Sequence, residues 1–470
     1  GITQTTQIII DVYRDSDRLY IHPVKVHKRH SPTMYMLHLW EGEDFTPVTN
    51  SAIISNILAR VQQPWVDFTI HRLGVWTRAF TAAEEVLYRV RDNKSPGSET
   101  ATHFQRLLRM AISRDERVIR LAEKYLDLSD ILEIRKRMIG TGLIGGKAVG
   151  MILARAILRK TDNKWDRLLE THDSFFIGSD VFFTYLVQNN LWRGSKKHKS
   201  LAGFLETASS IRRQMFSGSF PKYIVDQFEE ILDYFGQTPI IVRSSSALED
   251  NYGNSFSGKY DSIFCANQGT PEERLETFID AVRTVYASTM SKEALLYRSH
   301  NKLLDRDEHM GILVQRVSGD LYEHLYFPQI AGVGYSFNPY VWSSDIDPDD
   351  GFLRLVFGLG TRAVDRNDDD YTRVIALSTP GKRPETNAEE VRKYTQKKVD
   401  VLDLKDNRQS SRFFSDVGKS VSPAALDLFA KRDLDAEKQP FRRQSSEPVW
   451  ILTFDKLLLE TSFMKNMKEM

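Results

Sequence analysis

The chain has 470 residues, enough for two or three domains at ~150 residues each. Its 64 Lys and Arg residues balance 63 Asp and Glu, giving a formal net charge of +1, so nothing favours nucleic acid or a membrane surface as a partner. The hydrophobic fraction of 41% is ordinary for a protein with real cores.

Cys265 is the single cysteine, so no intramolecular disulfide is possible. This favours a reducing, cytoplasmic location and a small buried thiol. No apolar run approaches the ~20 residues of a membrane helix, and the N-terminus lacks the features of a signal peptide. Because the chain begins with Gly1 rather than Met, we expect both ends to be boundaries of a fragment.

The N-terminal part alternates apolar and polar residues in a pattern typical of strands. Stretches 6–14, 18–26 and 33–42 are rich in Ile, Val, Tyr and Trp, and they predict an antiparallel sheet with one solvated face. Asp92–Ser98 is a predicted linker, and 103–126 has the spacing of a surface helix. We therefore predict a β-rich N-terminal domain plus helix over residues 1–130, with no role that the sequence identifies.

Strands and helices mix in the second predicted domain, residues 131–470. A Gly-rich turn enters a helix at 140–160, and 173–188 is typical of a strand, a turn and another helix. A helix is predicted from Pro271 to about Tyr286. From Gln396 the chain is charged and loop-rich until a final strand and helix near its end. The fold class is α/β (α+β).

The turn GTGLIGGKA invites comparison with the phosphate-binding P-loop. It fails that pattern twice, because Thr141 replaces the first glycine and Ala148 follows the lysine. What remains is a lone Lys147 at the start of a helix, where amide N–H groups and a point charge favour phosphate. A purely structural turn is the alternative.

A second basic group follows the apolar strand Ile240–Val242. Arg243 stands at a strand end, where α/β proteins commonly bind ligands, and its planar guanidinium suits phosphate oxygens. Ser244 supplies a hydroxyl, and Gly258 allows backbone amides to approach an anion. The alternative is a surface arginine in a polar turn.

Two later segments are open to two interpretations each. The strands 310–319 and 331–339 could hold a flat base between them or form a plain hairpin of the core sheet. The segment 357–373 carries glycines, arginines and four aspartates, so it could bind a metal–phosphate assembly or form a solvated loop.

The order of these motifs is specific. GGK, VRSS, SFSGKYDS, GILVQRV, GVGYSFNP and GLG follow one another between Met138 and Ser378. In this order the chain resembles the ATP-binding domain of phosphoenolpyruvate synthase and pyruvate phosphate dikinase. The resemblance implies an ATP-grasp-like fold with ATP and Mg²⁺ as cofactors.

The resemblance also implies roles for individual residues. Lys147 and Arg243 would bind the ATP phosphates, with hydroxyls from Ser244 and Ser262 nearby. The remaining implied contacts come from Gly258 through its backbone, from Gln315 and Val317 beside adenine, and from the loop Gly358–Gly360 near the phosphates.

The chain also departs from the family pattern. Lys259 stands where the family usually carries Gln, and GLGTRAVDR replaces the commoner GLGE, so Arg362, Asp365 and Arg366 look like a sub-family variant. No histidine lies in a GGxTSH-like context, and the late Glu and Gln-x-Arg-Pro strand are missing. We therefore expect an ATP domain truncated at its C-terminal end.

The resemblance implies a phosphotransferase that passes a phosphoryl group from ATP to a histidine and then to pyruvate, on domains expected downstream. This chain alone is expected to be inactive. The alternatives are a dikinase with another acceptor, such as an antibiotic or a glucan, and a non-catalytic ATP-sensing or interaction module.

Overall fold

The computed structural model places the chain in two compact units, Gly1–Val317 and Ser318–Met470. The predicted boundary near residue 130 stays a prediction. Apolar residues on both sides of it pack into the same cores of the first unit. Asp365 and Arg366, most of the predicted linker at 92–98 and residues 249–257 lie outside the residues that the structure describes. These are 7–15, 18–26, 29, 31, 33–58, 74–91, 97–171, 173–191, 201–248, 258–304, 307–364, 370–437 and 448–470.

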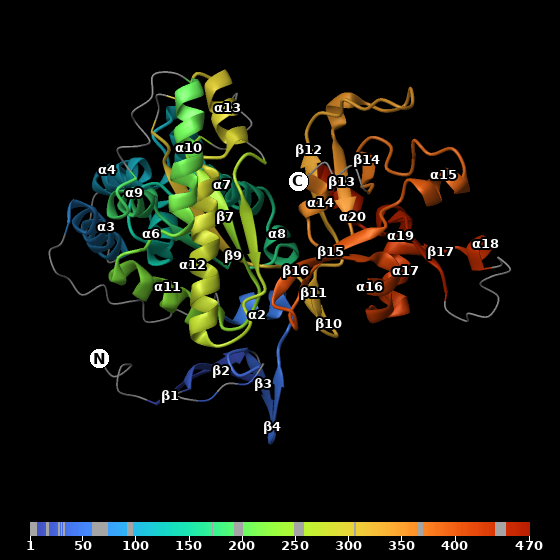
Figure 1. The fold of residues 1–470 in the computed structure, drawn as a ribbon, viewed down its shortest axis with the longest axis horizontal. Coiled ribbons are helices and arrows are strands. Elements are labelled where there is room, and N and C mark those ends of the chain that lie inside the picture. The colour runs from blue at the N-terminus through green and yellow to red at the C-terminus, as the bar shows by residue number, and fades with distance from the viewer. Residues whose placement is uncertain are drawn as a thin grey trace. The chain divides into compact units, whose positions relative to one another are not determined.

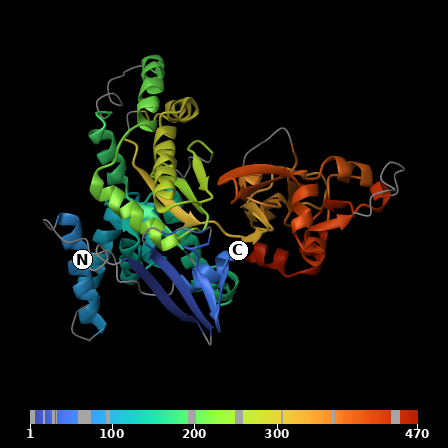
Figure 2. The same ribbon diagram turned by 60° about the horizontal axis from the view of Figure 1, so that its bottom comes forward.

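The predicted N-terminal antiparallel sheet is present, with strand order β1-β2-β3-β4 (Figures 1 and 2). Alternation places Tyr13 and Tyr20 in the core, while Val12 is exposed. The third strand is shorter than the predicted stretch 33–42, and β4 follows it directly. The strands are β1 (Ile8–Asp15), β2 (Arg18–Val26), β3 (His38–Glu41) and β4 (Asp44–Pro47).

Helices rather than further strands complete the N-terminal segment. The predicted single helix over 103–126 is wrong, because the chain breaks between a π-helical turn, η1 (Leu108–Ile112), and α5 (Glu116–Tyr125). Asp115 causes the new start by accepting a hydrogen bond from the main-chain N–H of Arg117 at 2.8 Å, as an N-cap does. The other helices here are α2 (Ser51–Leu58), α3 (Val75–Arg91), α4 (Gly97–Leu107) and α6 (Leu128–Lys136).

A five-stranded sheet with the order β5-β6-β9-β7-β8 forms the centre of the first unit. Ile240 and Val242 of β7 join one core, and Leu313 of β9 joins the other, so both faces of the sheet are covered. Burial on both faces explains the continuous apolar runs of the sequence. The strands are β5 (Met138–Ile139), β6 (Ser174–Ile177), β7 (Ile240–Ser246), β8 (Ser262–Cys265) and β9 (Met310–Arg316).

Figure 1 shows α10 and α12 side by side along this sheet, and α7 begins directly after the Gly-rich turn. Thr270 and Glu273 form a capping box at the start of α12, a local signal that marks where this helix begins. The helices are α7 (Gly146–Thr161), α8 (Trp165–Leu168), α9 (Ser179–Gln188), α10 (Leu201–Phe216), α11 (Lys222–Phe235), α12 (Pro271–Ser288) and α13 (Lys292–His300).

The second unit contains three small antiparallel sheets around one core. The hairpin alternative for 310–319 and 331–339 is wrong, because β9 pairs with β6 and β7 whereas β12 pairs with β13. The strands are β10 (Asp320–Tyr322), β11 (Leu325–Phe327), β12 (Ala331–Tyr335), β13 (Phe352–Val356), β14 (Arg373–Ala376), β15 (Lys398–Asp403), β16 (Arg408–Phe413), β17 (Ala430–Arg432) and β18 (Trp450–Leu452).

The predicted loop-rich C-terminal segment is also wrong. β15 and β16 form a regular hairpin around a turn that contains Asn407 in the left-handed region, at φ 49°. The predicted terminal helix is split at Thr461. The helices are α14 (Thr361–Val364), α15 (Ala388–Lys393), α16 (Phe414–Val417), α17 (Pro423–Phe429), α18 (Leu434–Glu437), α19 (Asp455–Glu460) and α20 (Phe463–Glu469), with short 3₁₀ turns η2 (Pro348–Asp350) and η3 (Gly418–Ser420).

Two sequence expectations can be followed in this fold. Cys265 is buried in β8, and burial raises the pKa of its thiol to about 12, which agrees with an inert core residue. Within the described ranges, no helix is both long and apolar enough to cross a membrane.

Candidate functional site

The Gly-rich turn lies directly against the end of β7. Gly145 has φ +86°, and a Cβ atom there would lie 1.5 Å from the main-chain oxygen of Ser245. Only glycine permits this approach. The main-chain N–H of Ala148 then donates to Ser245 Oγ at 3.0 Å, which fixes the first turn of α7 against the strand.

This packing brings Lys147 to the strand end that the sequence singled out. Its Nζ atom donates to Ser244 Oγ at 2.7 Å. Ser244 is fully buried, whereas Lys147 is half-buried. Two residues 97 positions apart in the chain therefore form one polar group.

Arg243 extends the group across the sheet. It lies opposite Leu313 of β9 and Ser262 of β8. Its Nη1 atom donates to Gln315 Oε1 at 3.2 Å. Like Lys147, Arg243 is half-buried, so a ligand could reach its guanidinium from solvent.

Gln315 makes two contacts that the sequence analysis missed. Its Nε2 atom donates to Ser174 Oγ at 3.2 Å and lies 3.0 Å from Met151 Sδ. The Met151 contact was readable in principle, because Met151 is four residues after Lys147 and so shares its helix face. The Ser174 contact depends on the pairing of β6 with β9, for which the sequence gives no signal.

The other residues predicted in the first unit differ in exposure. Gly258 has φ +71° with open space around its Cα, and Ser262 is exposed. Val317 is 5% exposed, and its main-chain N–H donates to Pro239 O at 3.0 Å. Val317 can thus serve a ligand only as part of an apolar wall.

The GLG segment belongs to the second unit. Gly358 has φ +90°, and a Cβ atom there would meet Val399 Cγ1 at 2.4 Å and the main-chain oxygen of Asp400 at 2.7 Å. Gly358 is therefore required for packing against β15. Gly360 leaves less constraint, since the nearest atom to its Cβ position is Ala331 Cβ at 3.4 Å.

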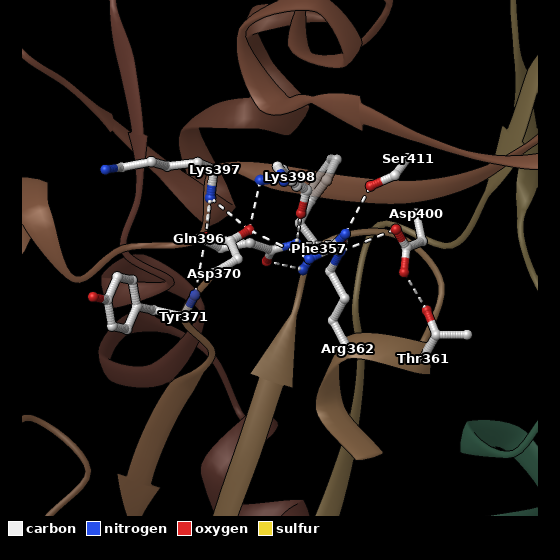
Figure 3. Close-up of polar contacts among 10 residues, drawn as sticks. All are labelled: Phe357, Thr361, Arg362, Asp370, Tyr371, Gln396, Lys397, Lys398, Asp400 and Ser411. Atoms are coloured by element: carbon white, nitrogen blue, oxygen red, sulfur yellow. Dashed lines mark hydrogen bonds and ion pairs between the residues drawn. The ribbon is translucent and has the colours of Figure 1, made fainter. Parts of the chain in front are cut away.

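Arg362 forms a buried ion pair, as Figure 3 shows. Its Nε donates to Asp400 Oδ1 at 3.0 Å, and its Nη2 donates to Ser411 Oγ at 2.7 Å. Thr361 Oγ1 donates to the other Asp400 oxygen at 2.6 Å. Arg362 is 8% exposed, so the solvated-loop interpretation does not hold for it.

Asp370 also has a structural role (Figure 3). Its carboxylate accepts main-chain hydrogen bonds from Lys397 at 2.9 Å and Lys398 at 2.6 Å. Within the described residues, no group of three or more His, Cys, Asp or Glu side chains could hold a metal ion.

The central sheet, the glycine turn at α7 and the convergence of Lys147, Arg243 and Gln315 define an ATP-grasp-like nucleotide-binding module. The chain belongs to the family described as pyruvate phosphate dikinase, AMP/ATP-binding domain, whose model matches residues 141–432. All residues assigned to the site from the sequence fall within this match.

A relative with a curated description is the uncharacterized phosphotransferase YvkC of Bacillus subtilis (strain 168). It is 25% identical over 225 residues, which cover 47% of this chain and 23% of the relative. The chain thus spans about a quarter of the relative's length.

Proposed function

We propose that Lys147 and Arg243 bind the phosphates of ATP. The observation that carries the proposal is that two half-buried cations, 96 positions apart in the chain, lie on neighbouring elements and are held by Ser244 and Gln315. Cations positioned in this way offset the negative charge of a triphosphate without moving when the ligand arrives.

The remaining contacts follow from this placement. Gln315 and the apolar wall at Val317 would contact adenine, Gly258 would offer its backbone and Ser262 its hydroxyl, while the buried Ser244 would orient Lys147. Mg²⁺, held mainly by the phosphates, would neutralise further charge on them.

The proposed reaction passes a phosphoryl group from ATP to a histidine on a phosphohistidine domain outside this chain, and from there to pyruvate on a third domain. We place the ATP domain at residues 131–470, the N-terminal domain at 1–130, and the protein in the cytoplasm. A dikinase with an antibiotic or a glucan as acceptor fits the same site. A non-catalytic ATP sensor also fits, since several residues of the GLGTR segment maintain the fold.

Calorimetric titration of the chain with ATP and magnesium tests the nucleotide site. Loss of a hydrogen bond to a charged group weakens binding by about 1.5–3 kcal/mol, or about 10- to 150-fold. We expect this loss for Arg243→Ala, and Arg213→Ala, which removes an exposed arginine of α10, is the matched control. Unchanged ATP affinity in a correctly folded Arg243→Ala variant would refute the assignment.

A second measurement separates binding from transfer. The chain is incubated with ATP labelled on its β and γ phosphates, and both released nucleotide and acid-labile protein label are followed. We expect binding without turnover, because the acceptor histidine lies elsewhere. Phosphohistidine formed on this chain would contradict the proposed acceptor.

A further inference from the structure

A cavity of about 750 Å³ lies between α5 and α7 in the first unit. Its volume is within the ~300–1,000 Å³ of typical small-molecule sites. The proposed nucleotide contacts Lys147, Arg243 and Gln315 do not line it. It is therefore a candidate for a second ligand.

The N-terminal segment builds one wall of this cavity, and the family domain builds the other. Val118 and Leu121 come from α5, which precedes the residues matched by the family model, whereas Leu153 and Ile157 come from α7. These four side chains are apolar, so they suit the apolar body of a ligand. The cavity thus gives the N-terminal segment a possible role.

Gly150 of α7 lines this cavity and leaves room beside it. A Cβ atom built on it would meet nothing within 4 Å. Glycine inside a helix is unfavourable compared with alanine, and here no neighbouring atom of the chain requires it. A larger side chain would occupy the cavity.

Arg114 and His309 give one end of the cavity its polarity. Among the described residues, the Arg114 guanidinium and the His309 ring make no hydrogen bond or ion pair, although the ring lies edge-on to Phe183. Burial, and then the charge of Arg114, lower the pKa of His309, which places the two groups within electrostatic range.

Two carboxylates stand at the same end. Asp115 is engaged by Arg117, whose Nη2 lies 2.9 Å from its Oδ2. Asp307 is exposed at the rim. With Asp115 already paired, Arg114 offers a positive charge and His309 a polar ring to a ligand that reaches this end.

We propose that the cavity binds a small organic anion with an apolar body, with the anionic group at Arg114 and the body between α5 and α7. Because Gly145 and Gly146 line the cavity and also form the turn that positions Lys147, occupancy changes the affinity for ATP. The effect on ATP affinity rests on the proposed nucleotide site, whereas the binding of the anion in the cavity does not.

The binding is tested by calorimetry with 4-phenylbutyrate and, as its matched control, 4-phenylbutylamine, which has the same apolar body with a cationic group. We expect 4-phenylbutyrate to bind at least tenfold more tightly. Equal affinity of the two, or no binding of 4-phenylbutyrate at millimolar concentration, would overturn the proposal.

Variants then place the ligand. Gly150→Trp fills the cavity and should abolish binding, while Gly150→Ala should preserve it. Arg114→Gln changes an exposed residue just before α5 and should weaken binding several-fold, and Arg120→Gln, an exposed change on α5 itself, is its control. If Gly150→Trp does not fold, Arg114→Gln decides. Full binding by Arg114→Gln would refute this placement of the anionic group.

The coupling is measured by titrating ATP with and without saturating 4-phenylbutyrate. Linkage requires that each ligand shift the affinity of the other by the same factor, and we expect a shift of at least fivefold. Unchanged ATP affinity, with both ligands bound, would refute the coupling. Failure of ATP to bind at all would refute the nucleotide site while the 4-phenylbutyrate result still stands.

Discussion

The two units differ in how far their positively charged side chains are buried. In the first unit, Lys147 and Arg243 are half-buried and contact the neutral side chains of Ser244 and Gln315. In the second unit, Arg362 is 8% exposed and contacts the carboxylate of Asp400 at 3.0 Å. From the sequence, all three stand near glycines in segments that could bind phosphate, and each segment also had a structural alternative.

This difference separates a cation that can serve a ligand from one that serves the fold. A cation that stays partly exposed to solvent can present its charge to an approaching phosphate, as half-buried Lys147 does. A buried carboxylate neutralises the charge of its cation, and the carboxylate is itself unstable in the core if that cation is removed. Changing the two kinds of cation should therefore alter different properties.

The largest expected effect is on stability, from Arg362→Met. The variant keeps much of the side-chain volume but leaves Asp400, 7% exposed, without its ion-pair partner. Breaking a buried pair from one side costs about 3–5 kcal/mol. Urea unfolding followed by near-ultraviolet circular dichroism should show this loss.

Arg408→Ala is the matched control for that measurement. Arg408 pairs with Asp406 at 3.2 Å, but its side chain is 68% exposed. Exposed pairs contribute about 0–1 kcal/mol. Equal losses in the two variants would mean that burial does not distinguish Arg362 from a surface arginine.

The next effect concerns His22, a buried base without a carboxylate partner among its described contacts. Burial, and then the charge of Arg316, lower the pKa of His22 to about 4. The folded-state pKa thus lies below the unfolded value of about 6.5, so the unfolded state binds more protons between them. Stability is full above pH 6.5 and falls as the pH drops towards 4, by about 3 kcal/mol.

The His22→Gln variant isolates this contribution. Its unfolding free energy should change less between pH 6.5 and 4 than that of the parent chain, and His300→Gln, an exposed change on α13, should follow the parent. The same pH dependence in the parent and in His22→Gln would show that other groups cause the acid sensitivity.

A smaller effect, on affinity rather than stability, is expected for Lys147→Met. The change keeps the aliphatic part of the side chain and removes the charge that Ser244 orients. ATP affinity should fall by about 1.5–3 kcal/mol, while the free energy of unfolding should fall by less than it does for Arg362→Met, because no buried charge is left without its partner. Calorimetry and urea unfolding of one preparation measure both, and a stability loss like that of Arg362→Met would remove the distinction between the two cations.

The sequence predicted the features that local chemistry determines. The strand before Arg243, the helix after Gly145 and the helix that begins at Pro271 are each encoded within a few residues. The order of motifs identified the family. The break at Asp115 was missed because apolar spacing continues across it, although an Asp at an N-cap is itself a signal.

The contacts between segments far apart in the chain could not be predicted from the sequence in the same way. The sequence gives no measure of the ion pair between Arg362 and Asp400, which are 38 positions apart. Nor does it show that β9 and β12 belong to different sheets, because each is equally suited to a hairpin. Both outcomes depend on which segments pack together, which local propensity does not determine.

The smallest expected effect distinguishes two glycines five positions apart. At Gly145 a Cβ atom would lie 1.5 Å from Ser245 O, so alanine must displace the turn from β7. At Gly150 the same atom meets open space. Gly150→Ala should therefore stabilise the chain by about 0.5–1 kcal/mol, the usual gain inside a helix, whereas Gly145→Ala should destabilise it and weaken ATP binding. Urea unfolding of both variants checks the signs, and destabilisation by Gly150→Ala would show that the cavity beside α7 is already filled.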